Sequence, residues 1–246
     1  MGPQDHIVTY PTTALYLRRS RSPARLSLVI VEPDAIHWKH ALLAALFFWR
    51  FHRILTRNHA LLRWLSNARP LVFGSTQITD PQSVNTVKDR HLSLIASGKR
   101  DLEGHRLRHQ IVDSLRDRGI AADILGRGYA PFDQKEDGLA PYHYSIIIEN
   151  VRERSYFTEK LVDALICRTI PIYWGAPDIA QYFDPAGMII CTSADDILHA
   201  ISSLPETPTP DMLDAAERNR TTALAYANLD RRIAETILGT FTAKAP

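Results

Sequence analysis

The stretch from Tyr142 to Pro185 decides the fold class, and it reads YHYSIIIENVRERSYFTEKLVDALICRTIPIYWGAPDIAQYFDP. Ser145–Ile148 is a continuous apolar run, which is typical of a strand buried on both faces of a sheet. A helix is predicted from Thr158 to Arg168, and a second strand from Ile170 to Trp174. A strand–helix–strand unit of this length predicts two parallel strands joined by a right-handed crossover.

The same alternation of strands and helices continues on both sides of this unit. Upstream we predict a strand over His91–Ala96, a helix over Gly104–Arg118 that Gly119 caps, and a strand over Ala121–Leu125. Downstream we predict a strand over Met188–Cys191, a helix over Ala194–Leu204 and a final helix over Pro210–Leu238. Residues 91–246 therefore read as one doubly wound parallel sheet.

Residues 1–90 form a shorter region with a β-α-β-α-β pattern. Its predicted strands are Leu26–Val31, Phe51–Thr56 and Leu71–Phe73, and its predicted helices are His40–His52 and His59–Trp64. The polar segment Asp80–Thr86 contains a proline and is a predicted linker. The fold class is therefore α/β, with two Rossmann-like lobes of parallel strands: an N-terminal lobe over 1–90 and a C-terminal lobe over 91–246.

The composition of the 246 residues, 45% hydrophobic and 23% charged, is ordinary for a soluble globular protein. Cys167 and Cys191 stand among apolar residues and belong to no CxxC pair, so we expect two reduced core thiols, which suits the cytoplasm. No secretory signal is visible in Met1–Tyr10. The longest apolar stretch, Ala41–Trp49, is far shorter than the about 20 residues that a membrane span needs.

The net charge of +2 hides an asymmetry between the two regions. Residues 1–90 hold 12 Lys/Arg against 5 Asp/Glu, which gives +7, and the remainder holds 17 against 22, which gives −5. A basic first region is compatible with an anionic acceptor or with peripheral contact to a membrane, and equally with a solvated arginine-rich surface. Nucleic acid is not an expected partner, because the arginines are scattered and accompany no binding motif.

The candidate site follows from the topology. Ligands of a doubly wound sheet bind beyond the carboxyl ends of its strands. The turns after four predicted strands should therefore line one crevice, and they hold Ser97 and Gly98, Gly126, Glu149 and Asn150, and Gly175 and Ala176. Glu149 directly closes an apolar strand, where a charged group needs a partner.

The helix that begins near Thr158 adds a site for an anion. A helix N-terminus offers free backbone N–H groups to a phosphate, and Glu159 and Lys160 occupy this first turn. Lys160 adds a full positive charge, and Arg108, in the first turns of its own helix, can hold two phosphate oxygens. Cations fixed at this place would stabilise a departing diphosphate.

Each of these charged residues also has an ordinary structural interpretation. Glu159 is a favourable acid in a first helical turn, and Lys160 could be a surface residue. Arg108 could pair with Asp101 or Asp113. Residue spacing alone does not choose between these interpretations.

Metal-dependent and covalent chemistry find no support in the sequence. There is no Asp-x-Asp, HExxH, G-x-S-x-G, G-x-G-x-x-G or P-loop motif. His105 and His109 stand four residues apart on a predicted helix but have no evident third ligand, so we expect them at the surface. No metal site is therefore predicted.

Tyr142 to Pro185 resembles the signature of the α-1,3-fucosyltransferases, glycosyltransferase family 10. That signature contains a Y-x-F-x-x-x-x-E-N stretch, then Y-[VIF]-T-E-K, then a P-[IV]-x-x-G turn and a short acidic-proline segment. All four parts have counterparts here in this order, apart from the phenylalanine of the first. Arg108–Leu115 and Asp123–Gly126 also resemble an upstream helix and strand of the family. Tyr144 stands where phenylalanine is common, and Ser97-Gly98 stands where the family has Ser-Asn.

The resemblance implies a GT-B architecture, from which this sequence departs by a short N-terminal lobe of about 90 residues. It implies inverting transfer of fucose from GDP-fucose to a hydroxyl of a glycan or glycolipid acceptor, without an essential metal. By position, Arg108 and Lys160 would contact the diphosphate, and Glu159 the fucose or its developing positive charge. The residues predicted to bind the donor are Ser97, Arg108, Gly126, Glu149, Asn150, Tyr156, Thr158, Glu159 and Lys160.

An inverting transfer needs a carboxylate that takes the acceptor proton. Glu32 ends the first predicted strand and is the candidate base, although it could equally be a strand-end surface acid. Two other functions remain open: the same fold with another nucleotide sugar, or a non-catalytic binding module, which the short N-terminal lobe suggests.

Overall fold

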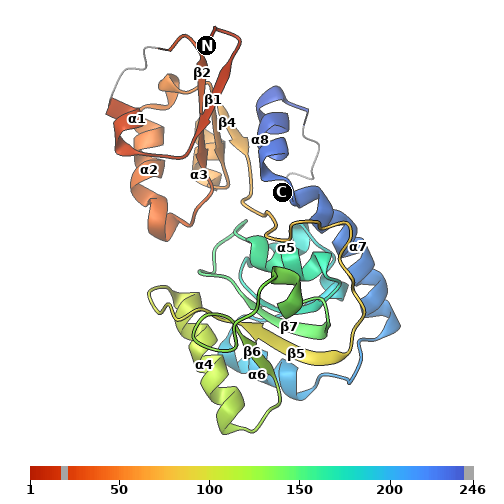
Figure 1. Cartoon of the computed structure of the whole chain (residues 1–246). Coiled ribbons are helices and arrows are strands. Elements are labelled where there is room, and N and C mark those ends of the chain that lie inside the picture. Colours follow the sequence, from red (N-terminus) through yellow and green to blue (C-terminus); the bar gives the residue numbers. More distant parts are fainter. Residues whose placement is uncertain (18–21, 241–246) are drawn as a thin grey trace. The chain divides into compact units, whose positions relative to one another are not determined.

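The two sheets of the protein belong to two separate units of the chain. The computed structural model describes residues 1–17 and 22–240. Unit 1 contains Met1–Phe73 and the segment that begins at Leu229, and unit 2 contains Gly74–Asn228 (Figure 1). The boundary therefore differs from the predicted one at residue 90. Residues 74–90 belong to unit 2 because they bond to it; the Thr76 hydroxyl, for example, donates to Asp163 over 2.6 Å.

Unit 1 is built on four parallel strands in the order β1-β2-β3-β4. The strands are β1 (His6–Thr9), β2 (Arg25–Ile30), β3 (Arg53–Thr56) and β4 (Ala68–Pro70). The helices are α1 (Thr13–Leu17), α2 (Asp34–Leu46), α3 (His59–Trp64) and α8 (Leu229–Leu238), and a 3₁₀ turn spans Phe48–Arg50. The sequence did not predict β1 or α1, which are only four and five residues long.

Two predicted elements of this part of the chain are corrected. The third predicted strand, Leu71–Phe73, lies just beyond β4, because the carbonyls of Val72 and Phe73 accept hydrogen bonds from the Arg232 side chain instead of joining the sheet. The predicted helix Pro210–Leu238 is two helices, α7 (Pro210–Tyr226) and α8. The chain breaks there because α8 packs Ile233 and Ile237 on the unit 1 sheet.

Unit 2 is built on five parallel strands in the order β6-β5-β7-β8-β9. The strands are β5 (Arg90–Ile95), β6 (Asp123–Leu125), β7 (Tyr142–Ile148), β8 (Ile170–Trp174) and β9 (Ile189–Ile190). The helices are α4 (Glu103–Asp117), α5 (Glu159–Ile166), α6 (Ala194–Ser202) and α7. The predicted strand–helix rhythm of this region is confirmed, and Gly119 ends α4 with a φ of 64°.

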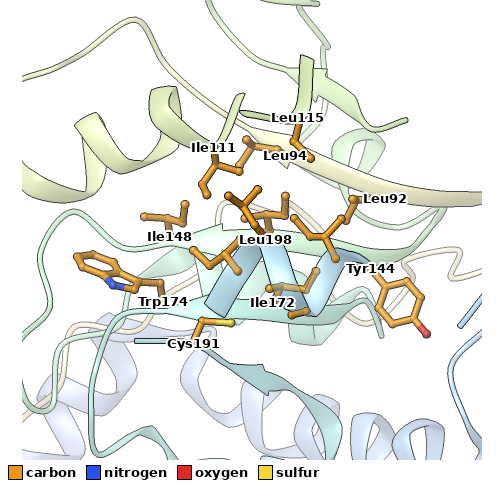
Figure 2. Packing of buried hydrophobic residues seen from close by; sticks show 14 of the residues in the cluster. Leu92, Leu94, Ile111, Leu115, Tyr144, Ile148, Ile172, Trp174, Cys191 and Leu198 are labelled. Carbon is orange, nitrogen blue, oxygen red and sulfur yellow. The ribbon is translucent and has the colours of Figure 1, made fainter. Parts of the chain in front are cut away.

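The core of unit 2 lies between its sheet and helices α4 and α6. Ile111 and Leu115 of α4 and Leu198 of α6 pack against Leu94 and Ile172 of the strands (Figure 2). Both cysteines are buried free thiols. None of the helices within residues 1–17 and 22–240 is long and apolar enough to cross a membrane.

Candidate active site

A cavity of about 120 Å³ opens beside the carboxyl end of β7. Its polar lining consists of Ser97, Arg108, Lys135, Glu159 and Lys160. Ile95, Leu139 and residues 146–148 complete the wall. The two cations that the sequence predicted to share a site therefore line one cavity.

Arg108 is fixed to the end of β7 by its own hydrogen bonds. Its Nε donates to the carbonyl of Ile148 over 3.0 Å, and its Nη2 donates to the same carbonyl and to Oδ1 of Asn150, over 3.1 Å in the second case. Nη1 makes no hydrogen bond to a described residue. Burial lowers the pKa of this guanidinium, while Glu149 and Tyr156 oppose that shift. The alternative in which Arg108 pairs with Asp101 or Asp113 is not observed.

A glycine allows Arg108 to reach this position. The Gly104 N–H donates to the carbonyl of Asn150 over 2.9 Å, and a Cβ on Gly104 would collide with the carbonyl of Glu149. Helix α4 can therefore start directly against the end of β7. Arg108 follows one helical turn later, which brings its side chain to the same strand end.

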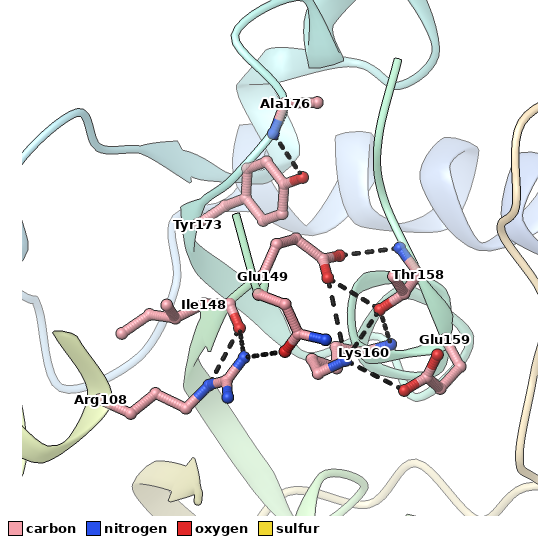
Figure 3. A network of polar contacts seen from close by, with 9 residues as sticks. Arg108, Ile148, Glu149, Thr158, Glu159, Lys160, Tyr173 and Ala176 are labelled. Atoms are coloured by element: carbon pink, nitrogen blue, oxygen red, sulfur yellow. Dashed lines mark hydrogen bonds and ion pairs between the residues drawn. The ribbon is translucent and has the colours of Figure 1, made fainter. Parts of the chain in front are cut away.

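Glu149 anchors the start of α5 from inside the protein. It is fully buried, and its two oxygens accept the backbone N–H and the hydroxyl of Thr158, both over 2.8 Å (Figure 3). Burial raises the pKa of Glu149, although the nearby charge of Lys160 opposes this. Glu149 does not line the cavity, so its predicted contact with a ligand becomes a role in positioning Thr158.

Lys160 is held among three oxygen-bearing side chains. Its Nζ donates to Oγ1 of Thr158 and to Oε1 of Glu159, both over 3.1 Å, and lies 3.9 Å from Oε2 of Glu149. Its side chain is 25% exposed, so an ion in the cavity can reach it. For Glu159, burial alone would raise the pKa, but the charge and hydrogen bond of Lys160 outweigh it and lower the pKa.

Thr158 links Glu149 to Lys160, and a substitution that removes its hydroxyl tests this role. The hydroxyl donates to Glu149 and accepts from the backbone N–H of Lys160, so it caps α5. We expect Thr158→Val to lower the free energy of unfolding by about 1–3 kcal/mol in urea denaturation, because the buried hydrogen bond to Glu149 and the two part-buried bonds from Lys160 are lost. Thr158→Ser, which keeps the hydroxyl, should retain nearly all of the stability. Equal stability of the valine and serine variants would contradict this role.

Lys135 is a cavity residue that the sequence did not reveal. It stands on the 3₁₀ turn Lys135–Gly138, between the predicted strands Ala121–Leu125 and Ser145–Ile148. Burial lowers the pKa of its amine, while the charges of Asp163 and Glu159 raise it. The strand-end rule missed Lys135 because nine residues separate it from the end of β6.

Asp163 is a buried carboxyl group whose charge acts on the Lys135 amine, and it makes the stability of the protein depend on pH. Burial raises its pKa from 3.8 to about 7, even though Thr76 and Gln77 donate hydrogen bonds to it. Between these two pH values the folded protein binds more protons here than the unfolded chain, so this carboxyl group stabilises the fold less as the pH rises.

The substitution Asp163→Asn should remove that dependence. We expect the free energy of unfolding of the variant, relative to the wild type, to rise by at least about 1 kcal/mol between pH 5 and pH 8. Urea denaturation at several pH values measures this difference. Parallel stability curves for the two proteins would rule out a buried, protonated Asp163.

A second buried carboxylate fixes the loop between β7 and α5. Asp178 accepts the backbone N–H of Ser155 over 2.8 Å and its hydroxyl over 3.0 Å. Ser155 has a φ of 57°, a strained conformation that these bonds hold in place. The next residue, Tyr156, is buried, so this contact sets the path of the chain towards Thr158. Asp178 lies beyond the turn Gly175-Ala176 that the strand-end rule selects, so that rule did not identify it.

Of the other predicted donor-binding residues, only some line the cavity. Ser97 lines it, whereas Gly126, Asn150 and Tyr156 do not. Gly126 has a φ of 110°, and a Cβ there would collide with the carbonyl of Ala96. Glu32, the candidate base, follows β2 in unit 1.

The histidine pair is not at the surface as expected. His105 and His109 are both buried. Nδ1 of His105 accepts the Leu102 N–H, and His109 contacts the Tyr129 hydroxyl over 2.7 Å and the Lys99 carbonyl over 3.1 Å. These hydrogen bonds hold the segment just before α4 against the first turns of the helix. Within the described ranges, no group of three His, Cys, Asp or Glu residues could hold a metal ion.

Comparison with known proteins gives the family of this segment. Residues 87–197 match the family described as glycosyltransferase family 10 (fucosyltransferase), C-terminal domain. This segment belongs to glycosyltransferase family 10. The family 10 segment contains every cavity-lining residue and every predicted donor-binding residue, whereas Glu32 lies outside it.

Curated relatives share part of the same segment. The alpha-(1,3)-fucosyltransferase FucT of Helicobacter pylori is 40% identical over 55 residues, which are 22% of this chain and 12% of that protein. Alpha-(1,3)-fucosyltransferase B of Drosophila melanogaster is 34% identical over 94 residues, 35% of this chain and 21% of that protein. The chain thus matches at most about a fifth of the length of these relatives.

Solved structures share the fold over nearly the whole chain. The crystal structure of an alpha1,3-fucosyltransferase with GDP-fucose matches 97% of this chain and 80% of that chain, with a TM-score of 0.58 and 16% identity. The crystal structure of TarM matches 98% of this chain and 55% of that chain, with a TM-score of 0.59 and 13% identity. The predicted α/β, GT-B-like class with parallel sheets is confirmed.

Proposed function

We propose that this protein is an inverting glycosyltransferase that transfers fucose from GDP-fucose to a hydroxyl of a glycan or glycolipid acceptor. One observation carries the proposal: Arg108 and Lys160, on two different helices of the family 10 segment, line a single cavity. Two fixed cations beside the N-terminus of α5 suit a diphosphate.

The roles of the cavity residues follow from their present bonds. Nη1 of Arg108 is the donor left over for a phosphate oxygen, since Nε and Nη2 are used by β7. A bound diphosphate would replace Glu159 as the partner of Lys160. Glu159 would then face the sugar, where a carboxylate stabilises the positive charge that develops at C1.

In the reaction, the bond from C1 of fucose to the phosphate oxygen breaks, and a bond from the acceptor oxygen to C1 forms on the opposite face. The acceptor proton passes to a carboxylate, and GDP leaves with the negative charge. Arg108 and Lys160 would stabilise that charge most strongly at the transition state.

We assign the proton acceptor to Glu32 and expect Glu32→Gln to reduce the turnover number at least about 100-fold. Affinity for GDP should be unchanged, because glutamine preserves shape and removes only the basic oxygen. Steady-state kinetics with GDP-fucose would measure this. Asp34→Asn is the matched control, since Asp34 stands two residues later and pairs with Arg57 over 3.8 Å. Equal turnover of wild type and Glu32→Gln would remove Glu32 from the mechanism.

Calorimetric titration tests the donor class. We expect GDP and GDP-fucose to bind with one site each, with and without a chelator, because the predicted site uses protein cations and no essential metal. A protein that binds neither compound would contradict the proposal. Affinity that disappears with chelator would contradict the metal-free site.

A second candidate keeps the fold and changes the donor. A crystal structure of a TarM mutant in a complex that includes UDP has a TM-score of 0.53 to this chain, and one of the pneumococcal O-GlcNAc transferase GtfA with UDP and GlcNAc has a TM-score of 0.51. Competition of GDP against UDP and CDP, and then of GDP-fucose against GDP-mannose, separates the two candidates. GDP binding without turnover on any acceptor would instead favour a non-catalytic binding module.

The cellular setting remains a prediction. Two buried free thiols favour a reducing compartment such as the cytoplasm. Peripheral contact with the inner face of a membrane would bring a glycolipid acceptor within reach.

A further inference from the structure

One edge of the unit 1 sheet gathers charged and aromatic side chains that the proposed reaction does not use. All four strands are parallel, so β1 to β4 begin at the same edge. Helices α2 and α3 each connect two of these strands, so they end at that edge. We call it the amino edge of unit 1; it is opposite to the edge at which Glu32 follows β2.

Three arginines at the amino edge point to the same face of the sheet. Arg53 is paired with Ser27, two residues after Arg25, and Arg69 is paired with Leu55, two residues after Arg53. Side chains two apart along a strand share a face, and directly paired residues do so as well. Arg25, Arg53 and Arg69 therefore form one row of positive charge.

No acidic side chain of a described residue forms an ion pair with these three arginines. Arg25 and Arg53 make no side-chain hydrogen bond or ion pair with a described residue. Two histidines join the row, since the rings of His6 and His52 lie 4.9 Å apart. Burial lowers the pKa of His52, and the charges of Arg53, Arg25 and Arg69 lower it further. Asp5, which precedes β1, has its carboxylate bonded to the Gly2 N–H.

Large apolar side chains lie exposed at the same edge. Trp49, in the 3₁₀ turn after α2, is 67% exposed, and Trp64, the last residue of α3, is 75% exposed. The guanidinium of Arg63 lies 5.6 Å from the ring centroid of Trp64. Leu46 at the end of α2 is also exposed, while Ala44 on the same helix is fully buried. Helix α2 is thus apolar on its outer as well as its inner side.

Charge decides what can cover this edge. A second copy of the chain would bring two unneutralised arginine rows together, which costs free energy. An apolar protein partner would bury Arg25 and Arg53 without counter-ions. The surface of an anionic bilayer accepts both groups, because tryptophan favours the interface and arginine pairs with lipid phosphates.

We propose that the amino edge of unit 1 docks on an anionic lipid bilayer, with Trp49 and Trp64 in the headgroup layer and Arg25 and Arg53 at lipid phosphates. The edge opposite Glu32 then faces the membrane.

Co-sedimentation of the full chain with vesicles tests this surface. We expect binding to vesicles of phosphatidylcholine with phosphatidylglycerol, weakening at high salt, and little binding to phosphatidylcholine alone. The double variant Arg25→Ser/Arg53→Ser should bind about 25-fold more weakly, at about 5-fold for each charge. The matched control Arg118→Ser/Arg127→Ser removes two exposed charges of unit 2 and should bind like the wild type.

A second double variant tests the contribution of the two exposed tryptophans to vesicle binding. Trp49→Ser/Trp64→Ser should lose at least about 10-fold in vesicle affinity at unchanged charge. Thermal unfolding and GDP titration check that each variant is folded, and they keep this outcome separate from the proposed transfer reaction. Absence of wild-type binding, equal binding to neutral vesicles, or full binding by Arg25→Ser/Arg53→Ser would overturn the proposal. So would a dimer in analytical ultracentrifugation that the tryptophan substitutions dissociate.

Discussion

Replacing Lys160 by alanine is expected to reduce fucose transfer at least about 1,000-fold, equivalent to about 4 kcal/mol of transition-state stabilisation. Lys160 is the cation at the start of α5 that reaches the cavity from a partly exposed position. Its charge would matter most when the diphosphate departs, so the turnover number should fall more than the affinity for GDP-fucose. Steady-state kinetics with GDP-fucose and an acceptor would measure both.

The fold should survive this substitution. Glu149 loses the amine that lies 3.9 Å away, but burial already raises its pKa, so the carboxyl can take up a proton instead of remaining an unpaired charge. Lys99→Ala is a matched control, since Lys99 is exposed and does not line the cavity.

A double variant separates the catalytic role of Lys160 from a structural one. Lys160→Ala/Glu149→Gln removes both charges of the pair and should recover stability without recovering activity. Recovery of transfer in the double variant, or undiminished transfer in Lys160→Ala, would refute the assignment.

The second large effect is expected for Arg108→Ala, which should weaken GDP binding about 100-fold, or about 3 kcal/mol. The substitution removes the only donor of Arg108 that is left for a phosphate, and it also frees the carbonyl of Ile148 and the amide of Asn150. We therefore expect a loss of about 1–3 kcal/mol in the free energy of unfolding as well. Calorimetric titration with GDP and urea denaturation measure the two losses.

Two further variants isolate the guanidinium. Arg108→Lys keeps the charge, but a single amine cannot hold Ile148 and Asn150 while also facing the cavity, so it should recover little. Arg106→Ala removes an exposed arginine from the same helix and should bind GDP normally. If Arg108→Lys bound GDP like the wild type, charge alone would explain the site and the fork geometry would be irrelevant.

The two substitutions test different parts of one site. Lys160 is held by carboxylates that a diphosphate would have to displace, whereas Arg108 is already locked to β7 and keeps a free Nη1. We expect losses of binding to dominate for Arg108 and losses of turnover to dominate for Lys160.

The sequence by itself determined most of unit 2. The end of β7 is a continuous apolar run that needs burial on both faces, and the helices of this unit follow the strands at crossover length, so β5, β7, β8 and α4 could be placed from local pattern. The strand-end rule then selected Ser97 and Glu149, and the N-terminus of the helix after β7 selected Lys160.

Only the tertiary structure decided which of those residues reach the cavity. Glu149 and Lys160 are neighbours of the same helix start, yet one is fully buried and the other faces the cavity, a difference that depends on the packing of α5 against β7. Lys135 and Asp178 join the site from loops whose paths no periodic pattern specifies. The packing of α8 on the unit 1 sheet could not be predicted from the sequence either, because it depends on contacts between residues that are far apart in the chain.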